Sequence, residues 1–200
     1  MQQNKQNARS RWSALLFSPT LQNKGTSHKI AYIGLMTAFT VIVNAFENKL
    51  GFSQFSLTIF VTVFAGILLG GIAGFSAGFF GDMIGFFLHP MGEYSPWIGI
   101  ATGLMAFFAA LCVYVPKGNG KWLYVKLALA CLLIFLCCTC GITTLYFHAL
   151  YGKGVPYFTY LLVRLFGVGH MQILNSIANT ILVVFAIPRL VKIKALEIKL

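Results

Sequence analysis

The sequence predicts an all-α integral membrane protein, a bundle of six transmembrane helices with both termini in the cytoplasm. Of the 200 residues, 58% are hydrophobic and only 10% are charged, whereas about a quarter of a soluble domain is charged. Apolar stretches of membrane-spanning length recur along the chain, and basic residues gather on one set of the connections between them. Together these observations favour a single membrane domain over any ordinary soluble fold.

Six apolar segments are expected to span the membrane: Ile30–Phe46, Ser56–Leu69, Ile72–Leu88, Trp97–Val115, Trp122–Leu150 and Tyr157–Ile187. The second is short and meets the third almost directly through Gly70 and Gly71. The last two are longer than the roughly 20 residues that cross hydrocarbon, which predicts tilt or a kink. Gly141, Gly167 and Gly169 are the candidate bend points.

Charge orients the bundle. With six spans, one side collects twelve basic residues: Lys5, Arg9, Arg11, Lys24, Lys29, Lys117, Lys121, Lys126, Arg189, Lys192, Lys194 and Lys199. The other side has only Lys49 and Lys153. This asymmetry predicts cytoplasmic basic tails at residues 1–28 and 191–200 around a membrane domain of residues 29–190, with no cleavable signal peptide. We attribute the net charge of +11 to this topology and to contact with anionic lipid, and expect no nucleic-acid partner.

The third segment combines closely spaced glycines with one acid. Its glycines recur at steps of three and four: Gly70, Gly74, Gly78, Gly81 and Gly85. On a helix they form one stripe, against which another helix packs closely. Asp82 has apolar neighbours and lies towards the outer side. Intramembrane acids mark functional sites by default, so Asp82 is interpreted either as a ligand contact or as an anchor that pairs with Arg or Lys.

Arg164 and an amide stripe are the other polar features of the spans. The guanidinium of Arg164 suits a carboxylate, phosphate or amide carbonyl of a ligand; the alternative is a structural pair with Asp82 or Glu93. Gln172, Asn175 and Asn179 share one helix face. We expect the outer amides to bind ligand and the inner ones to join helices.

Aromatic and cysteine residues each allow a functional and a plain interpretation. Five aromatic residues cluster at the expected outer helix ends, where they stack on a ring system or form an ordinary interfacial belt: Tyr94, Trp97, Tyr146, Tyr151 and Tyr157. The run Cys137, Cys138, Thr139, Cys140 resembles a metal site, but adjacent cysteines point in different directions and no histidine cluster completes the set. We therefore interpret the cysteines as small apolar residues and expect neither metal nor cofactor.

No nucleotide-binding loop, GxSxG or HExxH occurs, so an enzyme is not expected. The first span carries small residues at Ala31, Gly34, Ala38 and Ala45, a close-packing face for a partner subunit or for a neighbouring helix.

A family resemblance follows from these motifs. The chain resembles the substrate-binding S component of an energy-coupling factor (ECF) type ABC transporter, in the group of folate-, cobalamin- and pantothenate-type members. The resemblance covers about residues 30–190. It is carried by Gly81-Asp82-Met83-Ile84-Gly85, Pro90-Met91-Gly92-Glu93-Tyr94-Ser95-Pro96, the segments 70–74 and 144–154, and Arg164.

The resemblance implies a vitamin-binding subunit that captures its ligand outside the bacterial cytoplasmic membrane. It implies delivery inward with a membrane scaffold subunit and two ATPase subunits, the scaffold meeting Ala31, Gly34 and Ala38. The expected ligand contacts are Asp82, Glu93, Tyr94, Trp97, Tyr146, Tyr151, Arg164, Gln172 and Asn175. Because the run after Tyr94 departs from the folate-type pattern, the ligands are ordered cobalamin, folate, pantothenate. A stand-alone secondary transporter or channel is the alternative class, which internal inverted repeats would favour.

Overall fold

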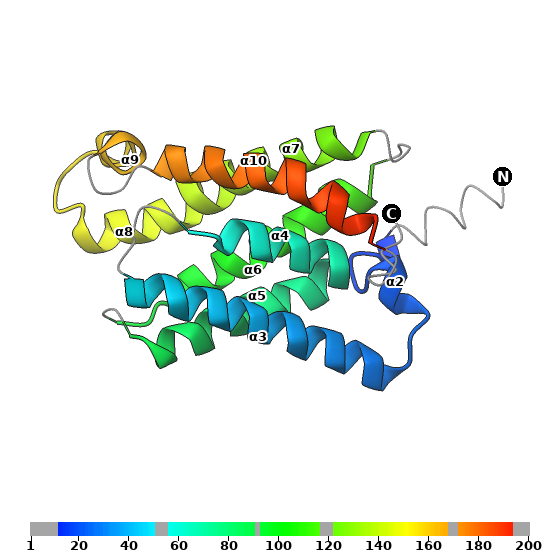
Figure 1. Ribbon diagram of the computed structural model, residues 1–200. Helices are drawn as coiled ribbons and strands as arrows, with labels where there is room; N and C mark the ends of the chain where they lie inside the picture. Colours follow the sequence, from blue (N-terminus) through cyan, green and yellow to red (C-terminus); the bar gives the residue numbers. More distant parts are fainter. Residues whose placement is uncertain (1–11, 51–55, 91–92, 117–121, 168–171, 194–200) are drawn as a thin grey trace.

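The computed structural model describes residues 12–50, 56–90, 93–116, 122–167 and 172–193, with the side chains of residues 47–50 outside the description. Its helices are α2 (Pro19–Gln22), α3 (Thr26–Leu50), α4 (Thr58–Leu69), α5 (Gly71–Leu88), α6 (Pro96–Tyr114), α7 (Leu123–Ile134), the π-helix η2 (Phe135–Thr143), α8 (Thr144–Tyr151), α9 (Tyr157–Phe166) and α10 (Gln172–Val191). All the regular structure in these ranges is helical. The long helices run alongside one another, with α2 at one end of the bundle and α9 at the other (Figure 1).

Five helical stretches among the described residues are long and apolar enough to cross a membrane: Thr26–Phe46, Gly71–Leu88, Pro96–Tyr114, Leu123–Tyr151 and Gln172–Val191. The prediction of an all-helical protein with several membrane spans is therefore confirmed. The expected second span is present as the shorter apolar helix α4.

The expected sixth span, Tyr157–Ile187, is wrong as a single helix. The helix α9 ends at Phe166, where Gly167 takes an extended conformation (φ −65°, ψ 144°), and α10 begins at Gln172. In Figure 1 α9 is seen nearly end-on, so it lies across the end of the bundle. Gly167 was one of the candidate bend points, and the change of direction places Arg164 at this end of the bundle.

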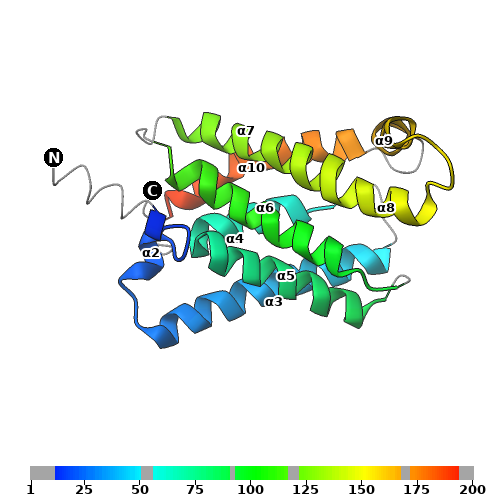
Figure 2. The same ribbon diagram turned by 180° about the vertical axis from the view of Figure 1, so that it is seen from behind.

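The glycine stripe does pack against neighbouring helices. A Cβ atom on Gly81 would lie 2.5 Å from Thr40 Cβ of α3, and one on Gly85 would lie 2.8 Å from Asn44 Cβ. On Gly78 it would meet the Thr102 carbonyl oxygen of α6 at 3.0 Å. The stripe therefore lets α5 approach both α3 and α6, the helices beside it in Figure 2.

The turn between α4 and α5 is closed by the segment that precedes α3. Gly70 has φ +102°, and a Cβ there would lie 2.5 Å from the Ser18 nitrogen. The Ser18 N–H donates to the Leu69 carbonyl (2.7 Å), and its hydroxyl donates to the Leu68 carbonyl (2.6 Å). The Ile72 N–H donates to the Leu15 carbonyl (2.7 Å). Residues of the expected amino-terminal tail thus satisfy helix-end groups that would otherwise lack partners.

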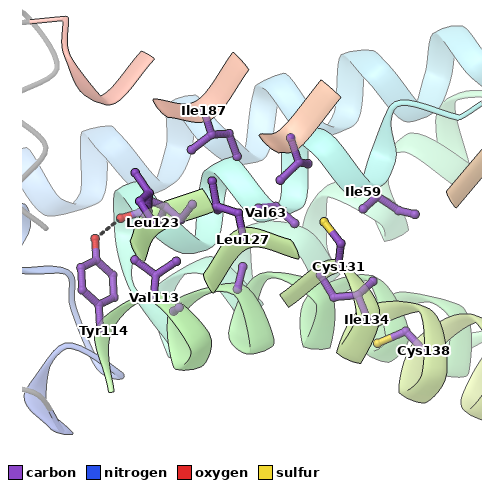
Figure 3. Close-up of a cluster of buried hydrophobic side chains, with 14 of the residues drawn as sticks. Ile59, Val63, Val113, Tyr114, Leu123, Leu127, Cys131, Ile134, Cys138 and Ile187 are labelled. Atoms are coloured by element: carbon purple, nitrogen blue, oxygen red, sulfur yellow. Dashed lines mark hydrogen bonds between the residues drawn. The ribbon is translucent and has the colours of Figure 1, made fainter. Parts of the chain in front are cut away.

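Two hydrophobic clusters hold the bundle. One joins α2, α3, α4 and α5, and the other joins α4, α6, α7, η2 and α10. Figure 3 shows the second cluster, in which Tyr114 donates its hydroxyl to the Ile67 carbonyl. Cys131 and Cys138 lie inside it beside Ile134, so these thiols pack as small apolar side chains.

Candidate functional site

A cavity of about 790 Å³ opens at the α9 end of the bundle. Its walls come from the last turns of α3 and α5, the first turns of α4, α6 and α10, the η2–α8 segment, and Arg164 of α9. Its size falls in the range of small-molecule sites, about 300–1,000 Å³. Polar and aromatic side chains line it together, as expected where a hydrophilic molecule binds inside a membrane protein.

Most of the predicted contact residues meet in this cavity. Its lining includes Asp82, Glu93, Tyr94, Tyr146, Tyr151, Arg164, Gln172 and Asn175. Trp97 is not part of the lining; its side chain is 58% exposed on the outside of α6. Contact between any of these residues and a ligand remains a prediction.

Asp82 is held by an amide and a hydroxyl. Asn44 of α3 donates from Nδ2 to Asp82 Oδ1 at 3.0 Å, and Thr102 Oγ1 of α6 lies 3.5 Å from the same oxygen. The Thr58 hydroxyl of α4 donates to Asn44 Oδ1 at 3.2 Å. Within the described ranges Asp82 has no cationic partner, so of its two interpretations the pairing with Arg or Lys is not seen. The acid instead ties α3, α4, α5 and α6 together beside the cavity.

A second polar network joins the start of α4 to α10. Asn179 is fully buried, and its Nδ2 donates to the Ser56 carbonyl at 2.6 Å. Its Oδ1 accepts the Phe60 N–H (3.2 Å), and Asn175 Oδ1 accepts the Ser56 N–H (3.0 Å). Asn179 therefore joins α10 to the start of α4, as expected for an inner amide. Gln172 and Asn175 line the cavity, and their expected role in ligand binding stays a prediction.

Arg164 is the buried cation of the site, with its side chain 8% exposed. Its guanidinium lies over the Phe147 ring at 4.6 Å from the ring centre, and Nη1 donates to Thr144 Oγ1 at 3.3 Å. It forms no ion pair with Asp82, Glu93 or any other acid that the structure describes. An arginine that lines a cavity without an anionic partner has donors left for an acceptor-rich or anionic ligand.

The helix α9 presents Arg164 inward because its opposite face is apolar. Phe158, Val163 and Phe166 are each more than half exposed on the outside. The Tyr157 hydroxyl donates to the Cys140 carbonyl of η2, and the His148 ring packs edge-on against the Tyr157 ring. These contacts fix α9 to the η2–α8 segment. π-helical turns such as η2 occur frequently at functional sites, and Thr139 and Thr143 of this one line the cavity.

Aromatic rings stand on two sides of the cavity. Phe86 and Tyr94 are 5.3 Å apart between ring centres at the α5 side, and Phe147 stacks on Tyr151 at 6.1 Å on the α8 side. Burial raises the pKa of the Tyr94 phenol, and the nearby charge of Asp82 raises it further. Tyr94 therefore stays protonated and neutral at physiological pH, which suits stacking on a flat ring.

Several lining residues were missed by the sequence analysis: Asn44, Ser56, Thr58, Thr102, Thr139, Thr143 and Phe147. Asn44 is the most informative of these, since an amide inside an apolar span is a signal for a functional or helix-joining role. In the described part of the chain, no group of three or more His, Cys, Asp or Glu side chains is arranged to hold a metal ion.

The small-residue face of α3 is turned away from the bundle. Ala31, Gly34 and Ala38 are exposed, and a Cβ on Gly34 would meet nothing within 4 Å. The neighbouring helix α5 instead packs against the opposite face of α3, at Thr40 and Asn44. Of the two expected uses of this face, packing against a helix of the same chain is therefore excluded for the described residues.

Several apolar helices around a polar cavity that opens at one end define a multi-pass membrane protein of the solute-binding or transport class. The sequence matches the family described as the ECF-type riboflavin transporter, S component, over residues 24–195. The chain belongs to this family, and the predicted ECF S component is confirmed. A comparison with curated proteins gave no match.

An S component is a vitamin-binding transport subunit rather than an enzyme. Such subunits work together with a scaffold subunit and ATPase subunits.

Proposed function

We propose that this chain captures riboflavin in the cavity at the α9 end and delivers it into a bacterial cell together with a scaffold subunit and two ATPase subunits. The observation that carries the proposal is the cavity of about 790 Å³, which is lined together by the Asp82 carboxylate, the buried Arg164 and aromatic rings. The family description supports a flavin as the ligand. The ring pairs on either side of the cavity support a flat aromatic ligand.

The size of the cavity bears on the choice among vitamins. The sequence placed cobalamin ahead of folate and pantothenate. Cobalamin is a corrinoid several times larger than a flavin, and a cavity of about 790 Å³ accommodates it less readily. Riboflavin, folate and pantothenate are all of a size that the cavity can enclose. The family description then favours riboflavin among these three.

The proposed topology keeps six spans and cytoplasmic termini. Lys24, Lys29, Lys126, Arg189 and Lys192 belong to segments at the α2 end, whereas Glu93 lies at the cavity end. The positive-inside rule then places the α2 end in the cytoplasm and the cavity mouth outside the cytoplasmic membrane. We include α4 as a crossing, although its 12 residues reach only about 18 Å.

We further propose that the exposed face at Ala31, Gly34 and Ala38 meets the scaffold subunit. Small side chains let two helices approach closely, and this face has no partner among the described helices. This contact would leave the cavity unobstructed, because Asn44 reaches the cavity from the opposite side of α3.

The proposal is tested by titrating the purified protein with riboflavin, cobalamin, folate and pantothenate in turn. We expect saturable quenching of flavin fluorescence at one site per chain, and no comparable affinity for the other three vitamins. Preferred binding of another vitamin would overturn the flavin assignment. In liposomes, we expect uptake only when the scaffold and ATPase subunits are present. Uptake by the chain alone would identify it as a stand-alone transporter.

A further inference from the structure

The two oxygens of the Asp82 carboxylate are in different situations. Oδ1 accepts the Asn44 amide at 3.0 Å and has the Thr102 hydroxyl at 3.5 Å. Oδ2 accepts no hydrogen bond from any residue in the described ranges, although Asp82 lines the cavity. A carboxylate removed from bulk water strongly favours donors at both oxygens. Whatever occupies the cavity can therefore supply a donor to Oδ2.

The neighbours of Asp82 fix which way the hydrogen bonds run. The Thr58 hydroxyl donates to Asn44 Oδ1, and Asn44 Nδ2 donates to Asp82 Oδ1. This relay orients the Asn44 amide, so that its N–H group always faces the acid. The carboxylate is thereby held as an acceptor, with Oδ1 engaged and Oδ2 left for the ligand. Asn44 acts through Asp82, without needing to touch the ligand itself.

The opposite side of the cavity carries the complementary chemistry. Arg164 comes from α9 and Asp82 from α5, which lie on opposite sides of this end of the bundle (Figure 1). Arg164 offers only donors, whereas Asp82 Oδ2 offers only an acceptor. A ligand that satisfies both needs a donor, an N–H or O–H group, at one end and acceptor atoms at the other.

We propose that Asp82 is the specificity-determining acceptor for a ring N–H of the ligand and that Asn44 is its positioning residue. This inference rests on the proposed binding of a flavin. An oxidised flavin carries a single ring N–H, the imide group at N3 of its pyrimidine ring, while its ribityl chain leaves from N10 of the central ring and bears hydroxyl oxygens. The flavin therefore lies with its imide edge against Asp82 and its ribityl chain towards Arg164 and Asn175.

The test compares riboflavin with 3-methylriboflavin, in which the imide hydrogen is replaced by a methyl group. We expect the wild-type protein to bind riboflavin about tenfold or more tightly than the methylated compound, the ratio typical of a lost hydrogen bond to a charged group. In Asp82→Asn the Asn44 amide still requires an acceptor, so the new amide turns its own N–H to the ligand. That variant should bind riboflavin more weakly and no longer prefer it over 3-methylriboflavin. The substitution in the protein and the methyl group on the ligand remove the same hydrogen bond, so their effects should not add.

Two further variants distinguish the positioning role of Asn44 from the ligand contact that Arg164 is proposed to make. Asn44→Ala should reduce the preference for riboflavin over 3-methylriboflavin without abolishing it. If Asn44 had only a structural role, the ratio of the two affinities would stay unchanged. Arg164→Gln is the matched control, since it should weaken both ligands by the same factor and keep the preference.

The outcomes distinguish the inference from the function on which it rests. Equal affinity of the wild-type protein for both flavins would overturn the role of Asp82 while leaving flavin binding intact. A preference that persists in Asp82→Asn would overturn it as well. No binding of either flavin by the wild-type protein would overturn both the inference and the proposed function. Equal wild-type affinities would overturn the role of Asp82 even if a variant fails to fold.

Discussion

Asn179 is expected to be the side chain on which the junction of α4 and α10 depends, and Asn179→Ala tests this. The side chain is fully buried and makes two bonds to the chain at the start of α4, donating to the Ser56 carbonyl (2.6 Å) and accepting from the Phe60 N–H (3.2 Å). Phe60 lies in the first turn of α4, where backbone N–H groups lack a helical acceptor. Each unpaired buried group costs about 1–3 kcal/mol, and hydrogen bonds between membrane helices average about 0.6 kcal/mol. Two unpaired groups would cost about 2–6 kcal/mol, and two bonds at the membrane average about 1.2 kcal/mol, so we expect an intermediate loss of about 2–4 kcal/mol.

The assay is thermal unfolding of the purified protein in detergent. At about 2–4 °C per kcal/mol for a chain of this size, Asn179→Ala should lower the Tm by roughly 4–16 °C. Thr180→Val is the matched control on the same helix, because the Thr180 hydroxyl donates to the Ser176 carbonyl within α10 and contacts the Cys131 thiol of α7, so the substitution leaves the α4–α10 bonds in place. It should shift the Tm by no more than about 2 °C. An unchanged Tm in Asn179→Ala, or equal losses in the two variants, would refute this role.

Three further predictions concern packing, binding and docking. Gly81→Ala should lower the Tm, because the new Cβ would lie 2.5 Å from Thr40 Cβ. Gly34→Ala is its control and should leave the Tm unchanged, because a Cβ there meets nothing within 4 Å. Equal Tm values for the two variants would contradict the close packing of α3 and α5. Arg164→Ala should weaken riboflavin binding by about 10- to 100-fold, the worth of a charged hydrogen bond, with the fold intact by circular dichroism; unchanged affinity would remove Arg164 from the site. Ala38→Leu should block uptake by the complete transporter yet preserve binding, and normal uptake would show that this face does not meet the scaffold.

Periodicity predicted those parts of the fold that depend on one helix at a time. The glycine stripe of α5 follows from steps of three and four, and Gly81 and Gly85 do lie against α3. The direction taken by the chain after Gly167 does not follow from such a pattern. A glycine permits a break, but the placement of α9 depends on contacts such as that of Tyr157 with the Cys140 carbonyl.

The composition of the site was more predictable than its connections. Asp82 and Arg164 were recognisable because charged groups inside apolar spans are costly, and are therefore rare unless they have a function. Their partners were not, since pairing with an opposite charge was one of the two interpretations of each residue. The structure instead gives Asp82 the Asn44 amide and Arg164 the Phe147 ring. Which face of α3 carries Asn44 into the cavity depends on how α3 packs on α5, a long-range contact without a local signal.

The central claim is that one vitamin molecule, riboflavin, occupies the cavity at the α9 end. Native mass spectrometry of the protein purified from cells grown with riboflavin tests it most directly. We predict a single adduct with the mass of riboflavin on the wild-type chain, and its loss from Arg164→Ala. A wild-type chain without an adduct, an adduct of another mass, or equal occupancy in both proteins would contradict the claim.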